Sequence, residues 1–293
     1  MPRAAGVIMI SKEIEKKILL IAFFLTFCAI LMNIVWDIIN EPHEAPPVFY
    51  NMTMGVISTV FAYIHSKRYF GLIKTNVLFF ATTIISFLME HFGVETGAIY
   101  GQYHYGTIYG PKLFDTVPII IPLSWFLFLY PAVIISNEIL SGSKSLVSFI
   151  QKGGGAVQII VFAAFDSIVM TALDILIDPI CTTRGSWFWT GLDGLRPEEI
   201  FYKIPVHNYF GWLVTTFLIF AVYRTVFFLK KNTYEEKDKL YFLPIYNYVG
   251  IFVIGTIEAW IVIKSPGIIF VSIMTLGLIS IMALYKNYLF YKE

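Results

Sequence analysis

Residues 18–36, ILLIAFFLTFCAILMNIVW, decide the fold of this chain. The stretch has no charged side chain, and roughly 20 mainly apolar residues are enough for a helix to cross the hydrocarbon core of a bilayer. It is longer than the apolar part of a secretory signal, and no small-residue cleavage site follows it. We therefore expect a membrane-spanning helix that stays in the protein.

Seven further apolar segments have the length and composition of membrane spans. Hydrophobic residues make up 57% of the 293-residue chain and charged residues only 14%, against about 25% in ordinary soluble domains. The mean hydropathy is +0.72. We expect one domain, 1–293, an all-α polytopic transmembrane helical bundle of about eight spans in a cell membrane. The spans are predicted at 18–38, 48–65, 72–90, 117–136, 156–177, 207–229, 244–263 and 267–285.

The basic residues give this map an orientation. Loops on the cytoplasmic side of a membrane carry an excess of lysine and arginine. If both termini are cytoplasmic, most of the 21 basic residues fall inside. The exceptions are Lys112, Arg184, Arg196, Lys203 and Lys264. This asymmetry predicts eight spans with both termini cytoplasmic. The lipid bilayer is the expected surrounding, and a net charge of +1 gives no reason to expect nucleic acid as a partner.

Polar side chains gather on the predicted outer side. The two long outer loops, about 91–116 and 178–206, are rich in tyrosine and tryptophan, and several carboxylic acids lie at the adjoining span ends. Acidic groups at membrane depth are costly and usually face a protein interior or a cavity. The sequence predicts one polar pocket in the outer half of the bundle, rimmed by aromatic residues. Its expected members are Glu90, Glu95, Tyr103, Tyr105, Asp166, Asp174, Asp178, Trp187, Trp189 and Asn208.

Three aspartates of the fifth predicted span point to acid–base chemistry. At about 100° per residue, Asp166, Asp174 and Asp178 fall near 0°, 80° and 120° around the helix, and we expect them to face inward together. Crowded carboxyl groups in an apolar pocket tend to keep a proton, because desolvation and mutual repulsion disfavour their charged form. A protonated carboxyl group can act as a general acid.

Some aromatic and acidic residues near the span ends also fit a simpler, purely structural interpretation. Trp125 and Trp260 lie at span ends, which is typical of an interfacial aromatic belt. The pair Asp178-Pro179 fits a helix end, because proline disfavours helical backbone in the residue before it. Asp37, at the end of the first span, fits a solvated surface position.

Several function classes differ in what they would require. Five histidines are too few for a multi-histidine di-iron enzyme, and Cys28 and Cys181 indicate neither a disulfide framework nor a metal site. We expect no metal and no cofactor. The spacing of Asp174 and Asp178 would suit magnesium-diphosphate in a polyprenyl transferase, although a second motif of that kind is not found. A transporter would show repeated, broken helices in two halves, and the sequence has no such symmetry.

The outer-loop motifs, taken in order, resemble one family. Residues 90–105, EHFGVETGAIYGQYHY, are followed by Gly110, Val117-Pro118 and Trp125. Later come Asp174-x-x-x-Asp178-Pro179, Trp187-x-Trp189 and residues 202–212, YKIPVHNYFGW. This set is similar to the membrane carotenoid-biosynthesis family that includes bisanhydrobacterioruberin hydratase and γ-carotene 1′-hydroxylase, an acyclic carotenoid 1,2-hydratase. The resemblance covers about residues 20–230.

The resemblance implies a cofactor-independent hydro-lyase (a hydratase) of isoprenoid metabolism. It would add water to the terminal C=C bond of an acyclic C40 or C50 carotenoid with a ψ end group, giving a tertiary alcohol as in bacterioruberin formation. Other carotenoid enzymes are possible partners. A lycopene cyclase, which closes a ring, and a prenyltransferase-type carotenoid elongase remain alternatives, as does a non-enzymatic lipid or pigment transporter.

The chemistry of hydration suggests a role for each residue of the expected pocket. Asp174 or Asp178 would be the acid, and Glu90 and Glu95 would hold the attacking water. The remaining residues would bind the substrate or orient a carboxyl group, namely Tyr103, Tyr105, Asp166, Trp187, Trp189 and Asn208.

Overall fold

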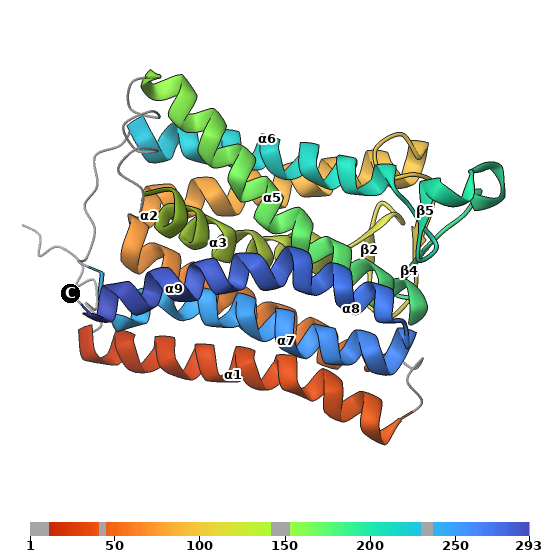
Figure 1. Cartoon of the computed structure of the whole chain (residues 1–293), viewed down its shortest axis with the longest axis horizontal. Coiled ribbons are helices and arrows are strands. Elements are labelled where there is room, and N and C mark those ends of the chain that lie inside the picture. Colours follow the sequence, from red (N-terminus) through yellow and green to blue (C-terminus); the bar gives the residue numbers. More distant parts are fainter. Residues whose placement is uncertain (1–11, 41–44, 142–152, 230–236, 293) are drawn as a thin grey trace, which may run out of the picture.

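The computed structural model describes residues 12–40, 45–141, 153–229 and 237–292 as a bundle of long helices with short strands at one end (Figure 1). In these parts of the chain, seven helices are long and apolar enough to cross a membrane, which confirms the all-α polytopic bundle. The helices are α1 (Lys12–Ile39), α2 (Val48–Thr96), α3 (Ile120–Ser141), α5 (Gly154–Thr183), α6 (His207–Leu229), α7 (Leu243–Ile263), and α8 (Pro266–Ser272) continued through a π-turn (Ile273–Gly277) into α9 (Leu278–Lys292).

Helix α2 contains two crossings, because the chain folds back on itself at Gly71. This residue has φ 76° and ψ 164°, outside the helical region, a backbone conformation that favours glycine. The Tyr63 hydroxyl donates a 2.6 Å hydrogen bond to Asn76 Oδ1, thirteen residues away. A straight helix would hold two such residues about 20 Å apart. The predicted spans 48–65 and 72–90 are therefore the two arms of α2, and the seven long helices make eight crossings.

Several helices extend beyond the predicted spans, and two of these extensions bear on the outer loops. Helix α2 continues to Thr96, and α5 runs through Pro179 to Thr183. The interpretation of Asp178-Pro179 as a helix end is therefore wrong. Membrane helices tolerate proline where neighbouring groups satisfy the freed backbone. Because α5 continues, Asp178 keeps helical geometry relative to the rest of this span.

Three small antiparallel sheets gather at what we call the strand end of the bundle (Figure 1). Strand β1 (Tyr103–Tyr105) pairs with β4 (Trp187–Trp189), β2 (Lys112–Leu113) with β3 (Val117–Pro118), and β5 (Ile200–Phe201) with β6 (Ile204–Pro205). The first described residue of α1 and the last of α9 lie at the opposite end. The β1–β4 pair joins the two long loops that the sequence predicts on one side.

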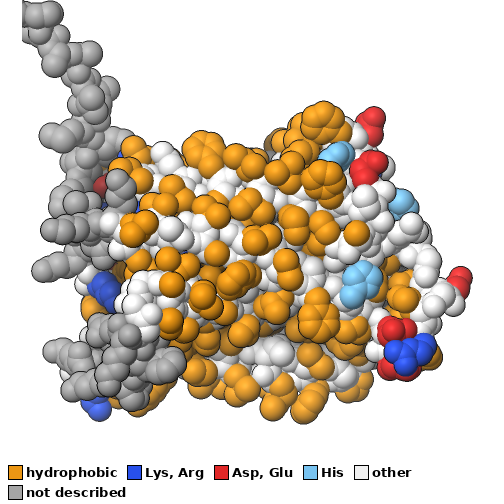
Figure 2. All heavy atoms as spheres, turned by 90° about the horizontal axis from the view of Figure 1, so that it is seen from above, with side chains coloured by type: hydrophobic (Ala, Val, Ile, Leu, Met, Phe, Trp, Pro, Cys, Tyr) orange, Lys and Arg blue, Asp and Glu red, His pale blue; other side chains and the backbone are white. Residues whose placement is uncertain are grey.

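The surface has the distribution of side chains that a bilayer requires. Figure 2 shows hydrophobic side chains over the middle of the molecule, with acidic residues and histidines at the strand end. Large apolar side chains point outward from α1, among them Ile21 at 60% and Phe24 at 63% exposure. Lipid is the solvent in which such a helix face is stable.

We predict that the strand end faces outward and both termini are cytoplasmic, because most of the lysine and arginine residues that the structure describes belong to helix ends and connections at the other end. Reporter fusions at Lys152, which lies outside the described residues, and at Ser186 should report opposite sides of the membrane. Activity of a cytoplasmic reporter at both positions would contradict the orientation.

Candidate active site

Two aspartates of α5 form the first part of the site. Asp174 and Asp178 are four residues apart, so their side chains lie one above the other on a single face of the helix. They are only 2% and 1% exposed. Asn208, near the start of α6, donates hydrogen bonds from Nδ2 to Asp178 Oδ2 over 2.7 Å and to Asp174 Oδ2 over 3.3 Å. One amide group therefore holds both carboxyl groups.

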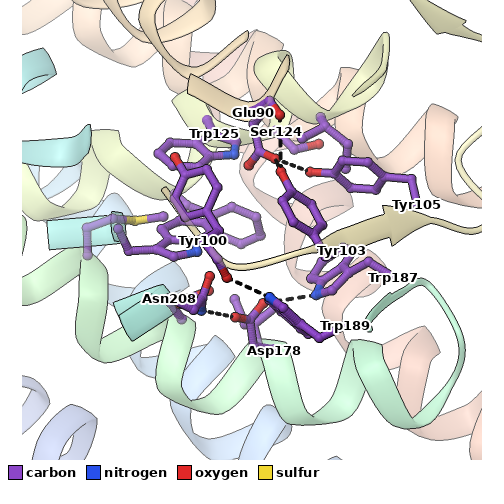
Figure 3. Close-up of a pocket in the computed structure, with 16 residues that line it drawn as sticks. Glu90, Tyr100, Tyr103, Tyr105, Ser124, Trp125, Asp178, Trp187, Trp189 and Asn208 are labelled. Atoms are coloured by element: carbon purple, nitrogen blue, oxygen red, sulfur yellow. Dashed lines mark hydrogen bonds between the residues drawn. The ribbon is translucent and has the colours of Figure 1, made fainter. Parts of the chain in front are cut away.

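Asp178 has a second hydrogen-bond donor. The indole Nε1 of Trp187 donates to Asp178 Oδ1 over 3.0 Å (Figure 3). Each oxygen of Asp178 thus accepts one N–H bond, whereas Asp174 accepts the longer bond from Asn208 and also forms a side-chain hydrogen bond with Asp178. The two carboxyl groups of the pair are not equivalent.

Glu90, in the second arm of α2, lines the same pocket. Its Oε2 accepts hydrogen bonds from the hydroxyls of Tyr103 and Tyr105, the latter over 2.6 Å (Figure 3). Burial and the neighbouring Glu90 raise the pKa of Tyr103 and of Tyr105 well above that of an ordinary tyrosine. Both phenols therefore remain protonated, and they position the Glu90 carboxyl group from the loop side.

The chain turns back toward the pocket because α2 ends at a glycine. Gly97 caps the helix with φ 68° and donates its N–H to the Gly93 carbonyl, a left-handed cap that glycine adopts at low cost. Tyr100 then fills a slot between α2 and α6, where a Cβ atom at Gly93 or Gly211 would lie 2.7 Å from its ring. Its hydroxyl forms a 2.7 Å hydrogen bond with Thr215.

Four aromatic side chains of the β1–β4 sheet cover one side of the pocket, and we call them the aromatic roof. Tyr103 lies opposite Trp189 and Tyr105 opposite Trp187. Alternate residues of a strand point to the same face, so these four rings share the face that lines the pocket. Backbone pairing between two distant loops therefore sets the position of the roof.

Two stacked tryptophans complete the lining of the pocket. Their place there was not predicted from the sequence. Trp125 of α3 and Trp212 of α6 have ring centroids 4.1 Å apart and planes within 8°. Trp125 is 3% exposed and forms a further side-chain hydrogen bond with Glu90. Its interpretation as an interfacial belt residue is therefore wrong. Trp260, at 53% exposure, fits that interpretation.

The predicted convergence of side chains from three spans is confirmed. Glu90, Asp174, Asp178 and Asn208 line one pocket of about 60 Å³. Since a water molecule takes up about 30 Å³ in the liquid, the pocket has room for about two waters or for a small branched group. The predicted roof residues line it too, namely Tyr103, Tyr105, Trp187 and Trp189.

Two predicted site residues do not join this pocket. Glu95 is exposed in the last turn of α2. Asp166 is fully buried, but it forms an ion pair with Arg224, whose Nε and Nη2 lie 2.6 and 2.7 Å from its two carboxylate oxygens. It precedes Asp174 by eight residues, which is about 12 Å along the helix axis. Asp166 therefore lies too far along α5 to reach the pocket.

The other carboxylates buried in the bundle are also paired with arginine. Arg184, next to the end of α5, forms ion pairs with Asp37 of α1 and Glu258 of α7. Asp37 is 3% exposed, so its expected surface position is wrong. Among the residues that the structure describes, Glu90 and the Asp174–Asp178 pair have no ion pair with lysine or arginine. This pocket therefore differs from the other buried acidic sites in the described part of the chain, because its carboxyl groups have no lysine or arginine partner.

The fold and the site define a polytopic membrane protein with a buried, aromatic-lined carboxyl pocket. The sequence model of the family described as "Carotenoid biosynthesis protein" matches residues 48–279, and the chain belongs to this family.

One curated relative is the bisanhydrobacterioruberin hydratase of Haloarcula japonica. It is 28% identical over 142 residues, which cover 48% of this chain and 42% of that protein. The match thus spans less than half of either protein. No solved structure matches the chain significantly.

Proposed function

We propose that this member of the carotenoid biosynthesis family hydrates the terminal C=C bond of an acyclic carotenoid end group and so forms a tertiary alcohol. The observation that carries the proposal is a set of buried carboxyl groups in an aromatic pocket that have no lysine or arginine partner among the described residues. Groups of this kind are expensive inside a membrane and generally mark function. The hydratase name of the relative from Haloarcula japonica supports the same reaction.

The Asp174–Asp178 pair is proposed to supply the proton. Burial without a cation disfavours a charged carboxyl group, so the pair holds at least one proton between its members. Asp178 already accepts a hydrogen bond on each oxygen. Asp174 is the member left to carry the proton and to donate it as a general acid.

The proposed reaction has two steps and balances without a redox partner. Asp174 protonates the alkene at its less substituted carbon, which breaks the π bond and leaves a tertiary carbocation. Water then attacks the cationic tertiary carbon, and Glu90 takes up one of its protons. Glu90 can act as the base because the hydroxyls of Tyr103 and Tyr105 donate to its carboxylate and stabilise the charged form. The acid has lost one proton and the base has gained one. Transfer through pocket water returns both groups to their starting forms.

The aromatic lining suits the proposed intermediate. The face of an indole or phenol ring attracts a cation by roughly 0.5–2 kcal/mol. The roof over the pocket and the Trp125–Trp212 stack place several rings around the space beside the carboxyl groups. They also limit access for bulk water, so that one positioned water can attack the cation.

The pocket lining favours hydration over prenyl transfer. A diphosphate is normally bound by charged donors such as arginine or lysine. None of the described residues that line the pocket is a lysine or an arginine. A diphosphate in this pocket would depend on magnesium held by the Asp174–Asp178 pair, with no lysine or arginine among the described lining residues to share its charge.

Expression in hosts that accumulate an acyclic C40 or C50 carotenoid tests the proposal by mass analysis of the pigments. We expect a product heavier by one water, formed by the wild-type chain and absent with an Asp174→Asn variant. A ring would leave the mass unchanged and indicate a cyclase, whereas an added prenyl unit would indicate an elongase. Unaltered pigment in membranes that contain the inserted protein would refute an enzymatic role on these substrates.

A further inference from the structure

A second and larger cavity adjoins the carboxyl pocket. It encloses about 270 Å³ between α1, the first arm of α2, α3, α5 and α7. Five residues line both cavities, namely Ile121, Ser124, Phe128, Ile177 and Trp187. The second cavity therefore meets the carboxyl pocket along the side chains of these five residues.

The second cavity is elongated along the helix axes. On the first arm of α2 its lining runs from Tyr50 to Ala62, and on α7 from Asn247 to Glu258. At 1.5 Å per residue these segments are about 18 and 17 Å long. The cavity thus covers a little more than half of the roughly 30 Å thickness of a bilayer core.

The walls of the second cavity are suited to an apolar chain. Aliphatic and aromatic side chains such as Ile30, Phe61, Leu127 and Ile251 supply most of the lining. The ion-paired Arg184 lies at the end nearer the strands, where it also fastens α1 to the bundle. Protein interiors are close-packed, with few voids larger than a water molecule. An apolar cavity of this size is therefore unusual, and an apolar molecule would fit it.

We propose that this cavity is the binding channel for the polyene chain of the substrate. The inference rests on the proposed function for the identity of the reacting end group. That end group lies in the carboxyl pocket, and the adjoining part of the conjugated chain extends along the channel. The small pocket fixes which atoms react, whereas the channel selects a long, apolar chain.

Two small residues on neighbouring helices give the means to block the channel. Gly255 of α7 lines it, and a Cβ atom there would lie 3.0 Å from Leu176, so a larger side chain must occupy channel space. Ala29 of the neighbouring helix α1 also lines it. Ile257 of α7 is 47% exposed on the outer face, and it does not line the channel. It provides a matched control on the same helix.

The test compares wild type with Gly255→Leu, Ala29→Phe and Ile257→Phe, each purified from membranes of a host that makes an acyclic carotenoid. Pigment per folded protein is measured by visible absorbance, and folding by a single sharp peak in size-exclusion chromatography. Overpacking a site costs enough to reduce binding on the order of tenfold. We expect that loss in the first two variants and not in Ile257→Phe. Two variants on different helices keep the test valid if one of them does not fold.

The outcomes separate the channel from the hydratase. Pigment retained equally by wild type and by a folded channel variant would overturn the channel, as would wild-type protein that retains none. Pigment that is retained by wild type, lost in the channel variants and never converted to an alcohol would overturn the hydratase while supporting the channel.

Discussion

Replacing Asp174 by asparagine is expected to lower the rate of hydration by about 10²–10⁴, the usual contribution of a positioned general acid, without reducing the amount of inserted protein. Asparagine keeps the shape of the side chain, and its carbonyl oxygen still accepts the bond from Asn208. It cannot release the proton that the alkene requires. The measurement is hydrated carotenoid per unit of membrane-inserted protein.

Two comparisons make this result specific. Asp178→Asn should lose activity and also stability, because an amide oxygen replaces two carboxylate oxygens that accept from Trp187 and Asn208. Glu95→Gln, at an exposed position, should behave as wild type. Turnover near the wild-type rate in both aspartate variants would remove α5 from the mechanism and leave Glu90 as the remaining candidate acid.

Asp166→Asn is expected to have the opposite effect, a large loss of stability with normal activity per folded molecule. Arg224 and Asp166 are both fully buried, and removal of one partner leaves an uncompensated charge, which costs about 3–5 kcal/mol. The free energy of unfolding in detergent, from a denaturant titration, gives the size of the loss.

A double variant provides the control for this second prediction. Asp166→Asn combined with Arg224→Gln removes both charges and should recover part of the stability lost by Asp166→Asn alone. Normal stability of Asp166→Asn together with lost turnover would instead return this aspartate to the active site.

Much of the fold could be predicted because every helix that crosses the bilayer must have about the same minimum length. Each crossing requires a long apolar run, and the breaks between runs are visible in the sequence, including the turn at Gly71 that divides α2. The passage of α5 through Pro179 could not be predicted, since it depends on packing around the helix. Nor could the β1–β4 pairing, which joins segments far apart in the chain.

The sequence was enough to predict how deep in the membrane the site residues lie, but not which side chains they contact. Glu90, Asp174, Asp178 and Asn208 occur at span ends on the same side, so a shared pocket followed from depth alone. The helical wheel grouped Asp166 with the other aspartates because a wheel ignores height along the axis. An arginine within the sixth predicted span was the available signal for its true partner.

The tryptophans were the hardest to assign. Trp125 and Trp212 lie near span ends, where an inward ring and a lipid-facing ring have the same sequence context. The two rings, one from α3 and one from α6, meet only in the folded bundle. A buried aromatic wall therefore becomes visible only in three dimensions.

Four of the six tryptophans in the chain line the carboxyl pocket, namely Trp125, Trp187, Trp189 and Trp212. Most of the indole groups that can emit in the ultraviolet therefore lie where the substrate's end group is proposed to bind. A conjugated polyene beside those rings accepts their excitation energy and dims that emission. The aromatic wall thus doubles as a built-in optical probe, one that follows occupancy of the site without a label and in the absence of any reaction.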